Sequence, residues 1–186
     1  MASYDLDMLE AAERLLDRDI GQRGPLPQAR IRRSISTAYY ALFHFVLDEF
    51  CRRVVGTHSS LSRRRRILAR TLSHRGLKRT FDKIRGRAID ASVAEFLATS
   101  FVTGGPAAAP GFARTLASVF ADTQTVRHDA DYDLNVSFSE KDARTIVTQV
   151  RRSISDWRAA DKESDRDFKQ ALSVLALLEG QLRGES

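Results

Sequence analysis

Seven consecutive residues, Arg127 to Asp133, hold one arginine, one histidine, three aspartates and one tyrosine. An arginine can stabilise charge on a phosphate and a histidine or carboxylate can carry a proton, so these residue types suit chemistry on a phosphodiester. Arg127 also lies on an apolar stripe of helical spacing, together with Leu116, Phe120, Thr123, Ala130 and Leu134. A guanidinium on such a stripe needs partners, and Asp131 is one helical turn away. Two interpretations stay open: an ion pair that fixes the helix, or a phosphate-binding arginine held by Asp131 and Tyr132.

His58 is the second candidate for proton transfer. It lies in the segment GTHSSLS, which interrupts a helical pattern, and Arg53 and Arg52 precede it by five and six positions. With so many arginines in the chain, such spacings also arise by chance. The alternatives for His58 are a surface loop position or a cap of the next helix.

The basic residues are concentrated in one segment. Between Arg63 and Arg87 there are eleven basic residues and one acid, a net charge of +10, whereas the whole chain carries +6. Such a cluster is the electrostatic footprint expected for phosphate. We therefore predict that Arg63, Arg64, Arg66 and Arg70 bind RNA backbones, with a solvated helical face as the alternative.

Composition excludes several classes of protein. The chain has 186 residues, enough for one domain with a core, and a single cysteine, Cys51. That count excludes an internal disulfide and any site with several cysteine ligands, and we expect no metal and no cofactor. No signal sequence is apparent, and the longest apolar-rich stretch covers about ten residues, roughly half of what spans a bilayer. We expect a cytoplasmic protein without a membrane partner.

Helical spacing of apolar residues dominates, and no stretch alternates convincingly as a strand would. The pattern predicts an all-α, antiparallel bundle of six to eight helices in a single domain. Ser137 or Ser139, each followed three residues later by an acid, is predicted to cap the helix that begins at Glu140. The predicted helices cover residues 3–20, 27–55, a short arginine-rich segment after Ser62, 76–86, 90–99, 112–133, 140–160 and 164–182.

The helix predicted for residues 27–55 is apolar on every side between Ala38 and Leu47, apart from His44. A helix that is apolar all round is buried all round. The simplest way to cover its second side is another copy of the protein. We therefore expect a homodimer whose interface includes Tyr39, Leu42, Phe43 and Val46, with a helix wrapped by its own neighbours as the alternative.

Three stretches resemble motifs of the HEPN family of small helical bundles. RRSISTAYYALFHFVLDEF is similar to the family's long second helix, GTHSSL to the His-Ser motif of one branch, and VRHDADYDL to that branch's Arg-x-x-Ala-Asp-Tyr-Asp segment. The resemblance covers a core of about residues 30–155. Residues 86–111 then look like an insertion, and about 164–183 like an additional C-terminal helix.

The resemblance implies a dimeric bundle that acts on or binds RNA, in a toxin–antitoxin or defence system, with an antitoxin or a nucleotidyltransferase as partner. Active members carry an arginine followed, after four to six residues, by a histidine. Here Arg127 matches the arginine, but Asp131 stands where the histidine is expected, followed by Tyr132. The catalytic set implied for a metal-independent ribonuclease is Arg127, His58, Asp131 and Tyr132. The alternative function is a non-catalytic dimeric adaptor whose basic helix meets an acidic protein.

The apolar stretch Ala38–Leu47 generates the first testable prediction. Light scattering after size exclusion at micromolar concentration should give about twice the chain mass of 20.9 kDa. A monomer under these conditions would contradict the prediction and remove the basis for a shared cleft.

Overall fold

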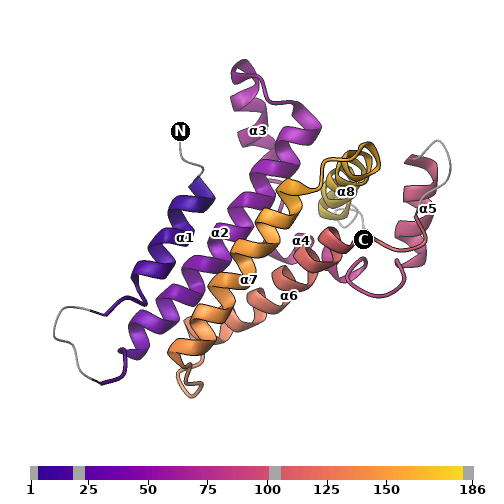
Figure 1. Cartoon of the computed structure of the whole chain (residues 1–186). Coiled ribbons are helices and arrows are strands. Elements are labelled where there is room, and N and C mark those ends of the chain that lie inside the picture. The colour runs from indigo at the N-terminus through magenta and orange to yellow at the C-terminus, as the bar shows by residue number, and fades with distance from the viewer. Residues whose placement is uncertain (1–3, 19–23, 101–105, 182–186) are drawn as a thin grey trace. The chain divides into compact units, whose positions relative to one another are not determined.

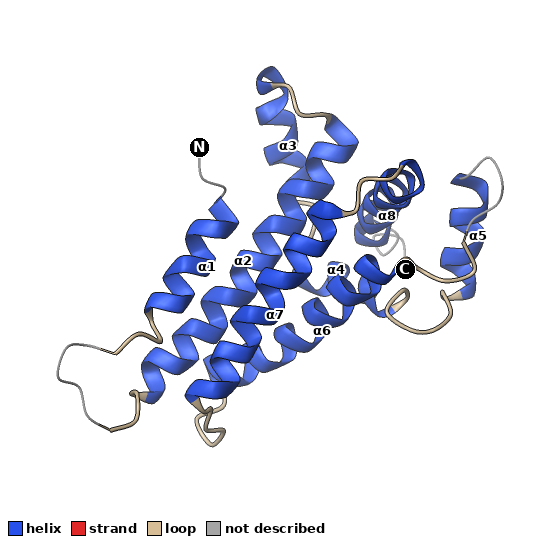
Figure 2. Cartoon of the chain, in the orientation of Figure 1, coloured by secondary structure: helices blue, strands red, loops and turns tan. Residues whose placement is uncertain are grey.

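The computed structural model describes residues 4–18, 24–100 and 106–181, and all regular structure within these ranges is helical (Figures 1 and 2). The predicted all-α fold is therefore confirmed. Within the described residues, none of the helices combines the length and apolar character that crossing a bilayer requires. In chain order the helices are α1 (Tyr4–Arg14), α2 (Gln28–Val55), the 3-10 helix η1 (Ser59–Leu61), α3 (Ser62–Ala69), α4 (His74–Asp82), α5 (Ala91–Ser100), α6 (Gly111–Tyr132), α7 (Glu140–Ala159) and α8 (Glu163–Gln181).

The chain divides into two compact units. Unit 1 comprises Met1–Phe45 and Val119–Ser155, and unit 2 comprises Val46–Ser118 and Asp156–Ser186. Unit 1 therefore contains α1, the first part of α2, the C-terminal part of α6 and most of α7. Unit 2 contains α3, α4, α5, α8 and the remaining parts of α2, α6 and α7. Arg127 belongs to unit 1, whereas His58 and the arginine-rich helix α3 belong to unit 2.

In unit 1, α1, α2 and α7 lie side by side (Figure 1). The buried Ser34 hydroxyl of α2 donates to the Ala12 carbonyl of α1 at 2.7 Å, and Arg151 of α7 pairs with Glu13 of α1 at 2.9 Å. Buried apolar residues recur at three- and four-residue intervals on each helix: Leu9 and Ala12 in α1, Ile31, Ile35, Ala38 and Leu42 in α2, and Ala143, Val147, Val150 and Ile154 in α7.

Helix α1 ends at Arg14, earlier than the expected extension to residue 20, of which residues 19 and 20 lie outside the described ranges. After Arg14 the backbone tightens, because the Leu16 N–H donates to the Glu13 carbonyl at 2.8 Å, three residues back. The carbonyls released by this turn are taken by arginines. Arg30 donates to the Leu15 carbonyl at 3.0 Å, and Arg144 donates to the Leu16 carbonyl at 2.6 Å.

Helix α7 begins with the predicted cap, at Ser139 rather than Ser137. The Asp142 N–H donates to the Ser139 hydroxyl at 3.1 Å, and the Ser139 N–H donates to the Asp142 carboxylate at 3.0 Å. These reciprocal bonds form a capping box and satisfy two N–H groups that the helix itself leaves free. The hydrogen bonds from Ser139 also hold the pKa of Asp142 below its usual value.

The apolar stretch of α2 is covered within one chain. Tyr39, Leu42, Phe43 and Val46 are 0, 0, 8 and 1% exposed. The all-round apolar character of the helix thus has the alternative explanation, burial among the chain's own helices. Dimerisation stays a prediction, and these four side chains offer little accessible surface to a partner.

In unit 2, an aromatic cluster surrounds Trp157, which is 1% exposed. Its ring lies 5.3 Å from that of Phe112 and 6.2 Å from that of Phe50, and its indole N–H donates to Glu49 at 3.0 Å. Helix α8 packs on α4 and α5 (Figure 1).

Lys169 of α8 binds backbone carbonyls at the C-terminal end of α7. It is 2% exposed, and its ammonium group donates to the carbonyls of Trp157, at 2.7 Å, and of Ala160. Burial and the nearby charge of Arg53 lower the pKa of Lys169. The carbonyls at the negative end of the helix dipole compensate for this desolvation.

Candidate functional site

Arg127 occupies the polar corner where α6 meets α2 in unit 1. Its Nε lies 2.8 Å from Asp131 Oδ2, and the two side chains are 18 and 24% exposed. A terminal guanidinium nitrogen donates to the hydroxyl of Tyr40 on α2. The other oxygen of Asp131 accepts a hydrogen bond from Ser36 of α2 at 2.6 Å. The ion pair suggested by the sequence is thus present within α6, and the hydrogen bonds to Tyr40 and Ser36 join it to α2.

Three tyrosine rings surround the Arg127 guanidinium. Its carbon lies 5.0 Å from the ring centre of Tyr40, 5.7 Å from that of Tyr132 and 5.9 Å from that of Tyr39. These are distances at which a cation is attracted to an aromatic face.

The electrostatics of the corner keep Arg127 charged. Burial alone would lower the pKa of Arg127, but the hydrogen bond to Tyr40 and the charge of Asp131 raise it above its usual value. Burial also raises the pKa of Tyr39, so that this phenol stays neutral. One Asp131 oxygen accepts a hydrogen bond from Ser36 and the other lies at ion-pair distance from Arg127, so both oxygens of this carboxylate already have polar contacts.

Arg32 of α2 holds the end of α6 in place, and the sequence interpretation did not identify it. Its two terminal nitrogens donate to four backbone carbonyls: those of Asp129 at 3.3 Å, Ala130 at 2.9 Å, Asp133 at 2.9 Å and Val136. The guanidinium carbon also lies 5.6 Å from the ring centre of Phe138. We call this set of contacts the Arg32 clamp. It satisfies carbonyls that the end of a helix leaves free, beside Asp131 and Tyr132.

His58 lies in unit 2 as the N-cap of η1, the 3-10 turn that precedes the arginine-rich helix α3. Its exposed ring accepts from the Ser60 N–H at 3.3 Å through Nδ1, which also lies 2.8 Å from the Ser60 hydroxyl. A backbone N–H can only donate, so Nδ1 is the acceptor of this bond. Nδ1 is therefore engaged by Ser60, while the residue as a whole stays exposed.

Helix α3 and its C-cap residue, Arg70, present the four arginines that we predicted to bind RNA. Arg63, Arg64, Arg66 and Arg70 are all exposed, and α3 buries none of its residues. The fifth arginine, Arg65, is used differently. It donates to the carbonyls of Gly56 at 2.7 Å and His58 at 3.0 Å, and so closes the end of α2.

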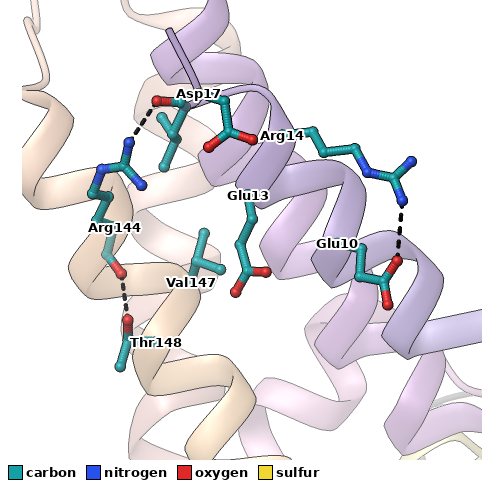
Figure 3. A pocket seen from close by; sticks show the side chains of 8 residues that line it. Glu10, Glu13, Arg14, Asp17, Arg144, Val147 and Thr148 are labelled. Atoms are coloured by element: carbon teal, nitrogen blue, oxygen red, sulfur yellow. Dashed lines mark hydrogen bonds and ion pairs between the residues drawn. The ribbon is translucent and has the colours of Figure 1, made fainter.

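A hollow of about 410 Å³ lies between α1 and α7 in unit 1 (Figure 3). Its lining is mixed: Glu10, Glu13, Arg14, Leu16, Asp17, Arg144, Val147 and Thr148. Figure 3 shows Arg14 paired with Glu10, an ion pair of 3.2 Å. Arg144 donates to the Leu16 carbonyl. Most of the charges at its rim are therefore matched within the protein. Among the residues that the structure describes, no group of histidine, cysteine or acidic side chains is arranged to hold a metal ion.

No protein-family model matches the chain, and comparison with curated proteins and with solved structures finds no match. The HEPN resemblance therefore remains a hypothesis that depends on the three sequence motifs.

The contacts of Arg127 lead to the second prediction, which concerns the free energy of unfolding. Arg127→Ala should lower the free energy of unfolding by roughly 1–3 kcal/mol, because Asp131 and the Tyr40 hydroxyl lose a partner in a partly buried place. Urea denaturation at pH 7 measures this. Arg33→Ala is the control, since Arg33 on α2 is exposed and pairs with none of the described acids; its change should stay within about 0.5 kcal/mol. Equal midpoints for the two variants would contradict the proposed role of the ion pair.

Proposed function

We propose that this chain is a HEPN-like RNA-binding protein that holds the phosphate backbone through α3 and does not cleave it. The observation that carries the proposal is the contrast between α3 and the other helices. Several exposed arginines on other helices pair with an acid one helical turn away, as Arg14 does with Glu10 and Arg52 with Asp48. The chain has no acid between Glu49 and Asp82, so the arginines of α3 have no such neighbour.

The exposed arginines of α3 have no evident role in the fold. Arg63, Arg66 and Arg70 recur at helical intervals and follow one side of α3 over about 10 Å. Like charges this close repel each other, and an incoming phosphate removes that repulsion while releasing its counterions. The planar guanidinium also suits bidentate contact with phosphate oxygens. These properties favour a polyanionic ligand over a solvated surface.

Catalysis is less well supported than binding. The two groups that would take the proton of a 2′-hydroxyl are both engaged: Asp131 by Arg127 and Ser36, and His58 Nδ1 by Ser60. Arg127, the candidate for stabilising a charged transition state, is itself bound to Asp131 and Tyr40. The family resemblance adds the expectation of a dimer in a toxin–antitoxin or defence system, with an antitoxin or nucleotidyltransferase partner.

The α3 arginines generate the third prediction. Arg63→Gln, Arg64→Gln and Arg66→Gln together should weaken binding to single-stranded RNA. They should also reduce the slope of log affinity against log salt by about 2, since each lost phosphate contact contributes about 0.7. Fluorescence anisotropy between roughly 50 and 200 mM salt measures both quantities.

The matched control for α3 replaces Arg14, Arg52 and Arg166 by glutamine. It removes the same formal charge from arginines that already pair with acids, and exposed pairs of this kind contribute little to stability. Control and α3 variant should therefore fold alike but differ in slope. If both reduce the slope equally, the effect belongs to net charge and α3 is not the binding surface. If the wild type binds an acidic protein but no RNA, the adaptor function replaces this proposal.

The engaged state of Asp131 and His58 generates the fourth prediction. Wild-type protein incubated in chelator with single-stranded and structured RNAs should leave them intact by gel electrophoresis. The outcome that would overturn this is cleavage by the wild type that disappears in both His58→Ala and Arg127→Ala, each shown to be folded by circular dichroism. That result would establish the metal-independent ribonuclease implied by the family resemblance.

A further inference from the structure

Tyr132, the last residue of α6, presents an aromatic ring at the surface of unit 1. The residue is 66% exposed, whereas Tyr39 on the same polar corner is fully buried. Its ring centre lies 5.1 Å from that of the exposed His128, one helical turn earlier, with the planes inclined by 50°. The guanidinium carbon of Arg127 lies 5.7 Å from the Tyr132 ring centre. A cation and an imidazole thus contact a ring that remains largely accessible.

The surroundings of Tyr132 restrict its movement. Arg127 is fixed by Asp131 and by the Tyr40 hydroxyl, and so cannot leave the ring without breaking these contacts. The Arg32 clamp holds the carbonyls of Asp129, Ala130 and Asp133, on both sides of Tyr132 in the chain. A ring that is already positioned loses little conformational entropy when a ligand stacks on it.

Tyr4 shows that exposure alone does not produce this arrangement. It is 62% exposed and its ring also lies beside a histidine, 5.3 Å from His44. In the part of the chain that the structure describes, however, no guanidinium contacts the Tyr4 ring. Tyr132 therefore differs from Tyr4 in two ways: the Arg127 guanidinium contacts its ring, and the Arg32 clamp holds the backbone on both sides of it.

We infer that Tyr132, together with His128, stacks an unpaired base of single-stranded RNA; this deepens the proposed function and rests on it. Stacking of a base on an aromatic side chain contributes roughly 1–3 kcal/mol and tolerates any base, because every base has a π face. Bases in an RNA duplex are already stacked on each other and are not available to the ring. Stacking on a π face neutralises no phosphate and releases no counterions. This surface therefore adds a contact that depends on the base and not on counterion release.

The test compares wild type, Tyr132→Ala, Tyr132→Phe and the matched control Tyr4→Ala, by anisotropy with single-stranded and duplex RNA of equal length. Tyr132→Ala should weaken single-strand binding by roughly 5- to 150-fold, with an unchanged salt slope and unchanged duplex binding. Tyr132→Phe and Tyr4→Ala should bind as wild type does. Substituting 2-aminopurine for single bases gives a direct readout, because stacking quenches its fluorescence in the wild type and not in Tyr132→Ala.

The outcomes separate this inference from the proposed function. Equal single-strand affinity of folded Tyr132→Ala and wild type would overturn the stacking role while leaving the α3 surface intact. An altered molecular mass of Tyr132→Ala in light scattering, with RNA affinity retained, would assign Tyr132 to a protein contact and overturn the inference as well. Absence of RNA binding by the wild type would overturn both proposals.

Discussion

The polar corner around Arg127 depends on the guanidinium of Arg32, whose hydrogen bonds go to backbone carbonyls. A helix end leaves carbonyl groups without partners and carries the negative end of the helix dipole. Arg32 supplies a positive charge and a planar set of donors to four carbonyls around the end of α6. Gln28, one turn earlier on α2, exchanges two hydrogen bonds with the backbone of Phe138. The start of α2 thereby fixes where α6 ends and α7 begins, and with it the placement of Asp131 and Tyr132.

Two groups of arginines in this chain differ in what they bind. Arg30, Arg32, Arg65 and Arg144 bind backbone carbonyls at the ends of helices. Those on the exposed surface of α3 bind nothing that the structure describes. A high arginine content therefore indicates an anionic ligand only in part, because some of the arginines bind the protein's own backbone. Net charge counts both groups alike, but only the second group is available to a ligand.

The sequence predicted the contacts between side chains that are close in the chain, and it missed those made to backbone carbonyls. Apolar spacing identified the helices, and the Ser139 capping box was visible because its members are neighbours in the chain. The pair Arg127–Asp131 was visible for the same reason.

Arg32 and Lys169 could not be found, because their partners are backbone carbonyls, which every residue has and no sequence pattern marks. The early end of α1 was missed for a related reason, since acceptors at Leu15 and Leu16 are taken by arginines from α2 and α7. Burial of α2 within one chain depends on helices far away in the sequence, so apolar character alone could not distinguish it from a dimer interface.

The two separate segments of unit 1 have a consequence for the order in which the protein folds during synthesis. Residues 46–118, which belong to unit 2, are made between the two segments. Arg32 precedes Val136, one of its acceptors, by 104 residues. At about 5–20 residues per second, that interval lasts roughly 5 to 20 seconds on the ribosome. During this time α1 and the first part of α2 lack the helices that cover them, whereas the first segment of unit 2 is completed before the second segment of unit 1 is made. A chain with this arrangement exposes its first apolar helices early, and it depends on late-arriving backbone acceptors to close the unit.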